Sequence, residues 1–166
     1  MTRFTHLHVH SHYSMLDGMS KIPDLIKKAK KNGMYAMALT DHGNMFGIKD
    51  FLDTVAKENG KVKDKIKALE AKVKEVEEIY TNTEIPEGTP KLSDLQQELE
   101  DLRGQIFKPI VGTEAYCARR TLYDKDKNYK EINPENGRER IIDRSGYHLI
   151  LLAKNLKGYQ IGRAHV

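Results

Sequence analysis

The feature that most constrains this chain is a long stretch rich in Lys and Glu, from about Met45 to Phe107. Its apolar residues repeat with heptad spacing in two runs, which are separated by a breaker-rich segment at 81–91. The pattern predicts an antiparallel helical coiled-coil hairpin, inserted at about 57–107, that projects from the domain. The two runs are Val62, Ile66, Leu69, Val73, Val76 and Tyr80, then Leu92, Leu95, Leu99, Leu102 and Ile106.

The charge of this hairpin favours a structural role. Glutamates nearly balance the lysines along it, and the whole chain has 28 Lys and Arg against 24 Asp and Glu, a net charge of +4. We therefore interpret the hairpin as a solvated structural or docking arm that carries no chemistry. Contact with DNA through its lysines is the alternative interpretation.

Runs typical of strands lie on both sides of the hairpin. Residues 4–10 alternate with period two, which predicts a strand with Leu7 and Val9 on one face and histidines on the other. Residues 35–40 form a short apolar run, as a buried parallel strand would. The runs at 108–118 and 147–153 predict further strands after the hairpin.

A helix is predicted between the first two strands, starting with Ser20 as its cap and ending at Gly33. Strands that alternate with helices give an α/β domain, either a β/α barrel or a doubly wound sheet. The barrel is favoured because polar residues follow the strands, where barrels hold their functional groups. A length of 166 residues suits one domain, which we place at 1–160.

Composition excludes several classes of protein. No apolar run approaches the roughly 20 residues of a membrane span, and histidines stand where a signal peptide would be apolar, so we expect a soluble, cytoplasmic protein. The single cysteine, Cys117, excludes an internal disulfide and is expected to be a small buried residue. Residues 161–166 match the product of a common sequencing-library adaptor in one reading frame, so we expect a non-native tail and assign His165 no role.

The histidines carry the strongest chemical signal. Four lie at positions 6, 8, 10 and 12, in and just after the first predicted strand. His8 and His10 are two apart on that strand, so both imidazoles point the same way and can share one or adjacent metal ions. We expect His6 to support the site or pack beside it, and His12 to face solvent or substrate.

Carboxylates and a further histidine follow the other predicted strands. Asp17 returns from the turn after the first strand, Asp41 and His42 follow the second, and Glu114 follows the third. Three strand ends that each deliver His or carboxylate to one face predict a metal site. Asp41 could orient an imidazole by accepting its distal N–H.

Four segments together resemble the PHP (polymerase and histidinol phosphatase) domain, in the branch found at the N-terminus of bacterial DNA polymerase III alpha subunits. They are "FTHLHVHSHYSMLDG", "MALTDHGNMFG", "KPIVGTEAYC" and "YHLILLAKNLKGY". The resemblance covers roughly residues 3–56 and 107–160, and the hairpin looks like an insertion found in some members. It implies a distorted (β/α)₇ barrel, of which this chain holds part.

The resemblance also implies a site with up to three zinc or manganese ions at the strand ends. His148 joins the ligand set only through the resemblance, because it begins its run and a plain parallel arrangement would turn it toward the wrong end of the sheet. The family's last ligands would lie beyond residue 160. The ligands implied within the chain are His8, His10, Asp17, His42, Glu114 and His148.

The function implied is that of an N-terminal fragment of a DNA-directed DNA polymerase, with a PHP domain that resembles a metal-dependent phosphoesterase, including 3′–5′ exonuclease activity. Its partners would be DNA and other replicase subunits, with no membrane. We expect the fragment alone to be inactive and assign no catalytic residue. The alternatives are a stand-alone phosphatase resembling histidinol phosphatase and a non-catalytic scaffold that metals stabilise.

Overall fold

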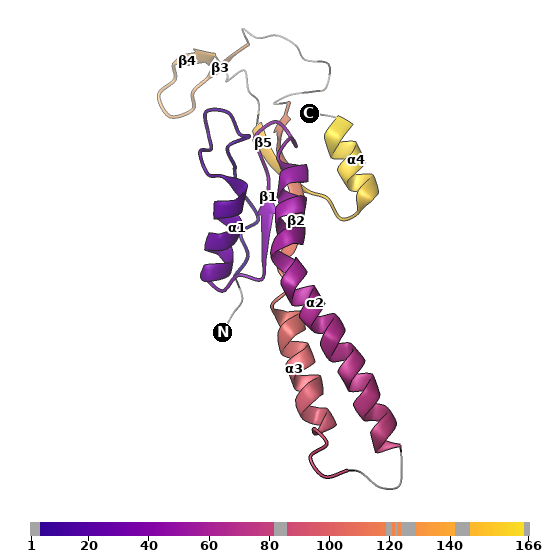
Figure 1. Cartoon of the computed structure of the whole chain (residues 1–166). Helices are drawn as coiled ribbons and strands as arrows, with labels where there is room; N and C mark the ends of the chain where they lie inside the picture. The colour runs from indigo at the N-terminus through magenta and orange to yellow at the C-terminus, as the bar shows by residue number, and fades with distance from the viewer. Residues whose placement is uncertain are drawn as a thin grey trace.

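The structure is a computed structural model that describes residues 4–81, 86–118, 121, 123, 129–141 and 147–164. The strands are β1 (Ala36–Leu39), β2 (Lys108–Cys117), β3 (Lys130–Ile132), β4 (Glu139–Ile141) and β5 (Tyr147–Leu152). The helices are α1 (Ile22–Lys31), α2 (Ile48–Tyr80), α3 (Leu92–Gly104) and α4 (Leu156–Ala164) (Figure 1). Among these helices, none combines the length and the apolar character that a membrane span requires.

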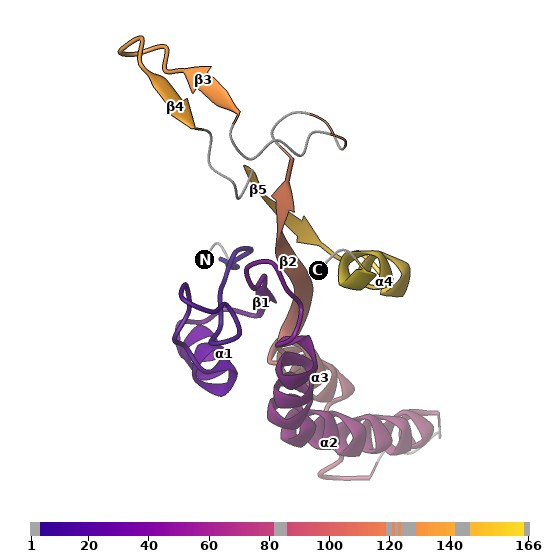
Figure 2. The same ribbon diagram turned by 90° about the horizontal axis from the view of Figure 1, so that it is seen from above.

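A small mixed sheet organises the domain. Its strand order is β1-β2-β5, with β1 parallel to β2 and β5 antiparallel to β2. In two perpendicular views, α1 and α4 lie on opposite sides of β2 (Figures 1 and 2). The predicted α/β class is confirmed, while the barrel stays a prediction, because the described strands form an open sheet and a separate hairpin of β3 and β4.

The predicted first strand is not a regular strand. Only His6 forms an isolated bridge, to Met37 of β1. The carbonyls of His6 and Val9 accept hydrogen bonds from the backbone N–H groups of Ala38 and Thr40, at 2.8 and 2.9 Å. Between these two bonds the N-terminal segment advances by three residues and β1 by two, so the segment has one extra residue. The Val9 N–H donates instead to the Thr40 hydroxyl at 2.9 Å. The extra residue breaks the ladder, but the segment still runs along the edge of β1.

Helix α1 forms nearly where it was predicted, with a different start. Its N-cap is Lys21, which makes no side-chain capping bond, so the prediction of Ser20 as cap was wrong. The Ser20 carbonyl instead accepts the backbone N–H of His12 at 3.0 Å, which ties the loop before the helix to the histidine segment. At the other end, Gly33 takes a φ of +76°, which favours glycine in the turn into β1.

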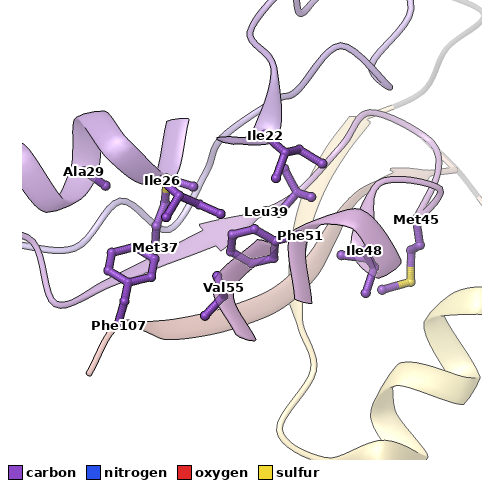
Figure 3. Packing of buried hydrophobic residues seen from close by; sticks show 10 residues of the cluster. All are labelled: Ile22, Ile26, Ala29, Met37, Leu39, Met45, Ile48, Phe51, Val55 and Phe107. Carbon is purple, nitrogen blue, oxygen red and sulfur yellow. The ribbon is translucent and has the colours of Figure 1, made fainter. Parts of the chain in front are cut away.

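The domain core lies between α1, β1 and the first turns of α2. Its most buried members include Ile26 of α1, Leu39 of β1 and Phe51 of α2. Phe107, just before β2, is 1% exposed and packs in the same cluster (Figure 3). Burying side chains of this size stabilises the folded domain by roughly 1.5–3 kcal/mol each.

The predicted hairpin is an extension of the domain itself. Helix α2 runs without a break from the core into the arm and passes through residue 57, where the insertion was predicted to begin. Helix α3 lies beside its outer part and runs in the opposite direction (Figure 1). The apolar cluster between them uses the predicted heptad positions, while a regular coiled-coil supercoil stays a prediction. The cluster is Leu69, Val73, Val76, Leu95 and Leu99.

One buried amide joins the arm to the core. Asn59 is 4% exposed on α2. Its Nδ2 donates to the Phe107 carbonyl at 2.8 Å, and its Oδ1 accepts the Phe107 backbone N–H at 3.0 Å. Since these two hydrogen bonds pair the outgoing helix with the returning chain, they set the place where the arm leaves the domain.

The second half of the chain holds elements that the sequence pattern did not indicate. Strands β3 and β4 form a short hairpin inside the segment 119–146, which had been interpreted only as polar. Cys117 is exposed at the end of β2, so the prediction that it is buried was wrong. The proposed tail boundary falls within α4, and His165 lies outside the described residues.

Candidate metal centre

Two histidines from the N-terminal segment meet one glutamate from β2. The Nε2 atoms of His8 and His10 are 3.0 Å apart. The Glu114 Oε2 atom lies 3.3 Å from the His8 Nε2 and 2.6 Å from the His10 Nε2. The hydrogen bonds that hold the segment to β1, together with the pairing of β1 with β2, therefore bring residues more than a hundred positions apart into one cluster.

Glu114 is the centre of this arrangement. The sequence pattern predicts Glu114 after its strand, but the residue lies inside β2, and its side chain is only 6% exposed. Burial by itself raises the pKa of this carboxyl, yet hydrogen bonds with His8 and His10 and the positive charge of His10 and His42 lower it below its ordinary value. The site therefore favours the negatively charged form of Glu114.

His148 reaches the same cluster because β5 is antiparallel to β2. The register places His148 opposite Tyr116 and Ile150 opposite Glu114. Side chains two apart on a strand share a face, so His148 and Glu114 lie on the same side of the sheet. The His148 Nδ1 lies 3.0 Å from the Glu114 Oε1. The expectation that a strand-opening histidine would face the wrong end assumed a parallel strand, and the observed direction removes that difficulty.

The loop between the N-terminal segment and α1 brings in a second carboxylate. Asp17 contacts His42 through its Oδ2 and the imidazole Nδ1. The His42 Nδ1 also lies 3.7 Å from the Glu114 Oε2. His42 follows β1 and forms an isolated bridge to Glu114 within β2, so the neighbouring strand holds its backbone.

All six predicted ligands come together. Among the described residues, three groups have donor atoms within 4.8 Å of one another. Neighbouring groups share a residue, so the three form one continuous cluster. They are His8, His10 and Glu114; His10, Asp17 and His42; and His42, Glu114 and His148.

Asp41 holds the loop rather than an imidazole. It is 1% exposed and accepts the Ser11 N–H at 2.7 Å, the Ser11 hydroxyl at 3.0 Å and the Ser14 hydroxyl at 2.8 Å. The Ser14 hydroxyl in turn accepts the backbone N–H of His42 at 2.9 Å. The interpretation of Asp41 as a partner of a histidine ring was therefore wrong. A buried carboxylate attracts hydrogen-bond donors, and the nearest ones here are two buried serines.

These serines were missed by the sequence analysis. Ser11 and Ser14 are both 0% exposed, which is unusual for serine and marks a satisfied polar core. Their proximity to the histidine pair was the available signal, but a serine-rich turn is ordinarily solvated. Tyr116, whose ring centroid lies 4.9 Å from that of His42, was also missed.

The donor set fits a metal ion. Within the described residues, the buried Nε2 of His42 has no hydrogen-bond partner, which is costly unless another group satisfies it. Donor atoms around a tetrahedral zinc ion are separated by about 3.3 Å. The His8 Nε2 lies 3.0 Å from the His10 Nε2 and 3.3 Å from the Glu114 Oε2, which is close to that separation, while the distance from His10 to Glu114 is shorter, 2.6 Å. Imidazole and carboxylate are ligands of divalent transition metals, so these residues could hold such ions.

Two of the N-terminal histidines stay outside the three groups. The ring of His6 packs against Phe4 with centroids 4.8 Å apart, and the ring of His12 lies 4.3 Å from that of Tyr13. Neither is a member of the groups that could hold a metal. The structure thus separates His8 and His10 from their neighbours, as the sequence analysis had done.

Comparison with known families identifies the family of this chain. The PHP domain family matches residues 6–162, which is most of the chain and includes all six clustered residues. The chain belongs to the PHP domain family. The open sheet and the helices described above are consistent with part of a PHP domain.

Similar proteins are much longer than this chain. A DNA polymerase III subunit alpha from Borreliella burgdorferi is 35% identical over 159 residues, which is 96% of this chain and 9% of that protein. The subunit from Campylobacter jejuni is 31% identical over 160 residues, 96% of this chain and 8% of that protein. The subunit from Aquifex aeolicus is 33% identical over 155 residues, 93% of this chain and 9% of that protein. The chain therefore spans less than a tenth of these relatives.

Proposed function

We propose that this chain is the N-terminal part of a bacterial DNA polymerase III alpha subunit and that its PHP domain is a metal-dependent phosphoesterase. The observation that carries the proposal is the convergence of four histidines and two carboxylates in three linked groups. The match to relatives named DNA polymerase III subunit alpha supports the polymerase context. The partners proposed on that basis are DNA and other replicase subunits, in the cytoplasm.

We further propose that the cluster holds up to three ions, zinc or manganese. The ligands would be His8, His10, Asp17, His42, Glu114 and His148. A bound ion of this kind lowers the pKa of a coordinated water to about 7 and stabilises negative charge on a phosphate oxygen. These two properties suit hydrolysis of a phosphoester.

The residues of the chain have distinct tasks in this proposal. Glu114 supplies buried negative charge at the junction of two groups, which offsets the charge of cations. Asp17 contacts the Nδ1 of His42 and so orients the imidazole ring, which leaves the Nε2 of His42 to bind a metal ion. The His8 side chain is 50% exposed, so the cluster is open to a substrate on that side. We assign no separate general acid or base.

Metal content is the first test. The purified chain is freed of metal, incubated with zinc or manganese, desalted and assayed by inductively coupled plasma mass spectrometry. Simultaneous substitution of His8 and His10 by Ala should remove most of the bound metal, because these residues contribute to two of the three groups. The matched control is His12→Ala, which changes a nearby histidine outside the groups and should leave the metal content unchanged. Equal metal content in the double variant and the unsubstituted chain would refute the metal centre.

Two further measurements separate the competing functions. Hydrolysis of bis(p-nitrophenyl) phosphate and of single-stranded DNA is measured on the metal-loaded protein that the source gene encodes in full. Metal binding without hydrolysis would favour the scaffold over the phosphoesterase. Sequencing the source DNA downstream of Gln160 tests the polymerase context, since a stop codon within about one domain length would favour a stand-alone phosphatase.

A further inference from the structure

Tyr116 lies beside the candidate metal centre, and no role described so far uses it. Its ring centroid is 4.9 Å from that of His42 and 5.3 Å from that of His148. The residue is nonetheless 55% exposed. Tyr116 thus contacts two of the proposed ligands while more than half of its surface stays open to a ligand.

Strand geometry holds the ring on the side of the metal centre. Tyr116 is two residues after Glu114 on β2 and pairs directly with His148 on β5, so all three side chains lie on one face of the sheet. The ring thus flanks two of the proposed ligands, and its position follows from the same strand pairing that positions them.

The chain after His42 is shaped to leave room for this ring. Gly43 has a φ of +65°, and a Cβ atom there would come within 3.0 Å of the Tyr116 Cε2. A larger residue at this position would be strained and would press on the ring. The loop that carries His42 therefore accommodates an aromatic side chain at the edge of the cluster.

We propose that Tyr116 is the surface on which the organic group of a phosphoester lies while its phosphate is held at the metal centre. This inference rests on the proposed phosphoesterase function and deepens it. A half-exposed ring offers a flat apolar surface to a planar group such as an aromatic ring or a nucleobase. The site accordingly prefers phosphoesters of planar aromatic groups to those of small aliphatic groups.

Binding of phosphonates tests this preference without hydrolysis, because their carbon–phosphorus bond is not an ester. The manganese-loaded full chain is titrated calorimetrically with phenylphosphonate, ethylphosphonate and inorganic phosphate. We expect phenylphosphonate to bind on the order of 5- to 100-fold more tightly than ethylphosphonate, the range typical of stacking on an aromatic side chain. In Tyr116→Ala the two phosphonates should bind with about equal affinity, whereas Tyr116→Phe should keep the preference for phenylphosphonate.

The matched control is Tyr147→Ala. Tyr147 is 56% exposed and neighbours His148 on β5, but it lies on the opposite face of the sheet. This variant should keep the preference for phenylphosphonate. In Tyr116→Ala itself, the manganese content and the affinity for inorganic phosphate should stay at the level of the unsubstituted chain. Loss of the preference for phenylphosphonate in this variant then indicates a lost contact with the organic group.

The outcomes are distinguishable. A preference that survives in Tyr116→Ala, or that is lost equally in Tyr147→Ala, overturns the role of Tyr116. Equal binding of the two phosphonates by the unsubstituted chain, with phosphate still bound, overturns the preference but leaves the phosphoesterase proposal standing. Manganese binding without any phosphate binding overturns the phosphoesterase proposal, and the role of Tyr116 with it.

Discussion

The domain core and the arm are both built from apolar side chains, but they bury them to different degrees. In the core, Ile26, Leu39 and Phe51 are all 0% exposed. In the arm, the clustered residues are 4–8% exposed. Helices on a sheet can enclose a side chain from several directions, whereas two helices side by side leave their seam open at both edges.

The two regions also differ in chemistry. All six clustered residues belong to the N-terminal segment, the loop that follows it, the loop after β1 and strands β2 and β5, and none belongs to the arm. A metal cluster needs donors held within a fraction of an ångström, which a densely packed region supplies. The comparison indicates that the core positions the site and that the arm contributes no donor to it.

The largest effect is expected from Phe51→Ala in the core. Removing a ring that is 0% exposed leaves a cavity between α1, β1 and α2. The free energy of unfolding should fall by about 3–5 kcal/mol, as measured by urea denaturation of the metal-free chain. Its neighbour Leu52 is 40% exposed, so Leu52→Ala should change stability by no more than about 0.5 kcal/mol. Equal losses for the two variants would contradict the placement of the core.

The next effect is expected from Asp41→Asn, at the boundary between core and site. Asparagine keeps one oxygen that can accept the bonds now made to Oδ1, but its amide nitrogen cannot accept the Ser11 hydroxyl that now donates to Oδ2, and the negative charge that strengthens all of these bonds is lost. The unfolding free energy should drop by about 1.5–3 kcal/mol, the usual range for hydrogen bonds to a charged group. The exposed Asp53→Asn is the matched control and should have little effect in the same denaturation experiment. An Asp41→Asn variant as stable as its parent would show that the serine contacts are not important for folding.

A smaller effect is expected from Asn59→Ala, which breaks the joint between the two regions. It leaves the buried N–H and C=O of Phe107 without their side-chain partners. Stability should decrease by about 1–3 kcal/mol, and hydrogen exchange should increase at the Phe107 amide. Lys57→Ala, at an exposed position on the same helix, serves as the control. Unchanged protection of the Phe107 amide would mean that Asn59 does not hold the joint.

The smallest effect, on metal binding, is expected from removing the arm. The Asn59 contacts with Phe107 show that the two ends of the arm are adjacent, so a short Gly-Ser linker can replace residues 61–104. The bound metal per chain should stay the same, because no member of the three groups is deleted. Mass spectrometric metal analysis would detect a loss. Such a loss would mean that the arm supports the site after all.

Local sequence patterns were sufficient to predict elements whose structure depends on residues close together in the chain. The heptad residues of the arm and the apolar run of β1 were recognised because their spacing matches a helix or strand period. The spacing of His8 and His10 likewise placed their imidazoles together. The start of α1 shows the limit of this approach, because Ser20 has the chemistry of a cap but uses its carbonyl to bind His12.

Sequence patterns were insufficient to predict contacts between segments that are far apart in the chain. The N-terminal segment alternates like a strand, but its pairing with β1 contains an extra residue because the Thr40 hydroxyl takes the Val9 N–H. Asp41 was expected to serve a histidine, but its nearest donors are Ser11 and Ser14. In each case a contact with a distant residue replaced the arrangement that the local pattern predicted.

The sequence by itself determined the donor types of the candidate centre and the elements that carry most of them. Only the tertiary structure decided that β5 runs antiparallel to β2, which brings His148 to Glu114, and that Tyr116 flanks them. The physical reason is that periodicity reports which face of a segment is buried. It does not report which strand will be its neighbour or in which direction that strand will run.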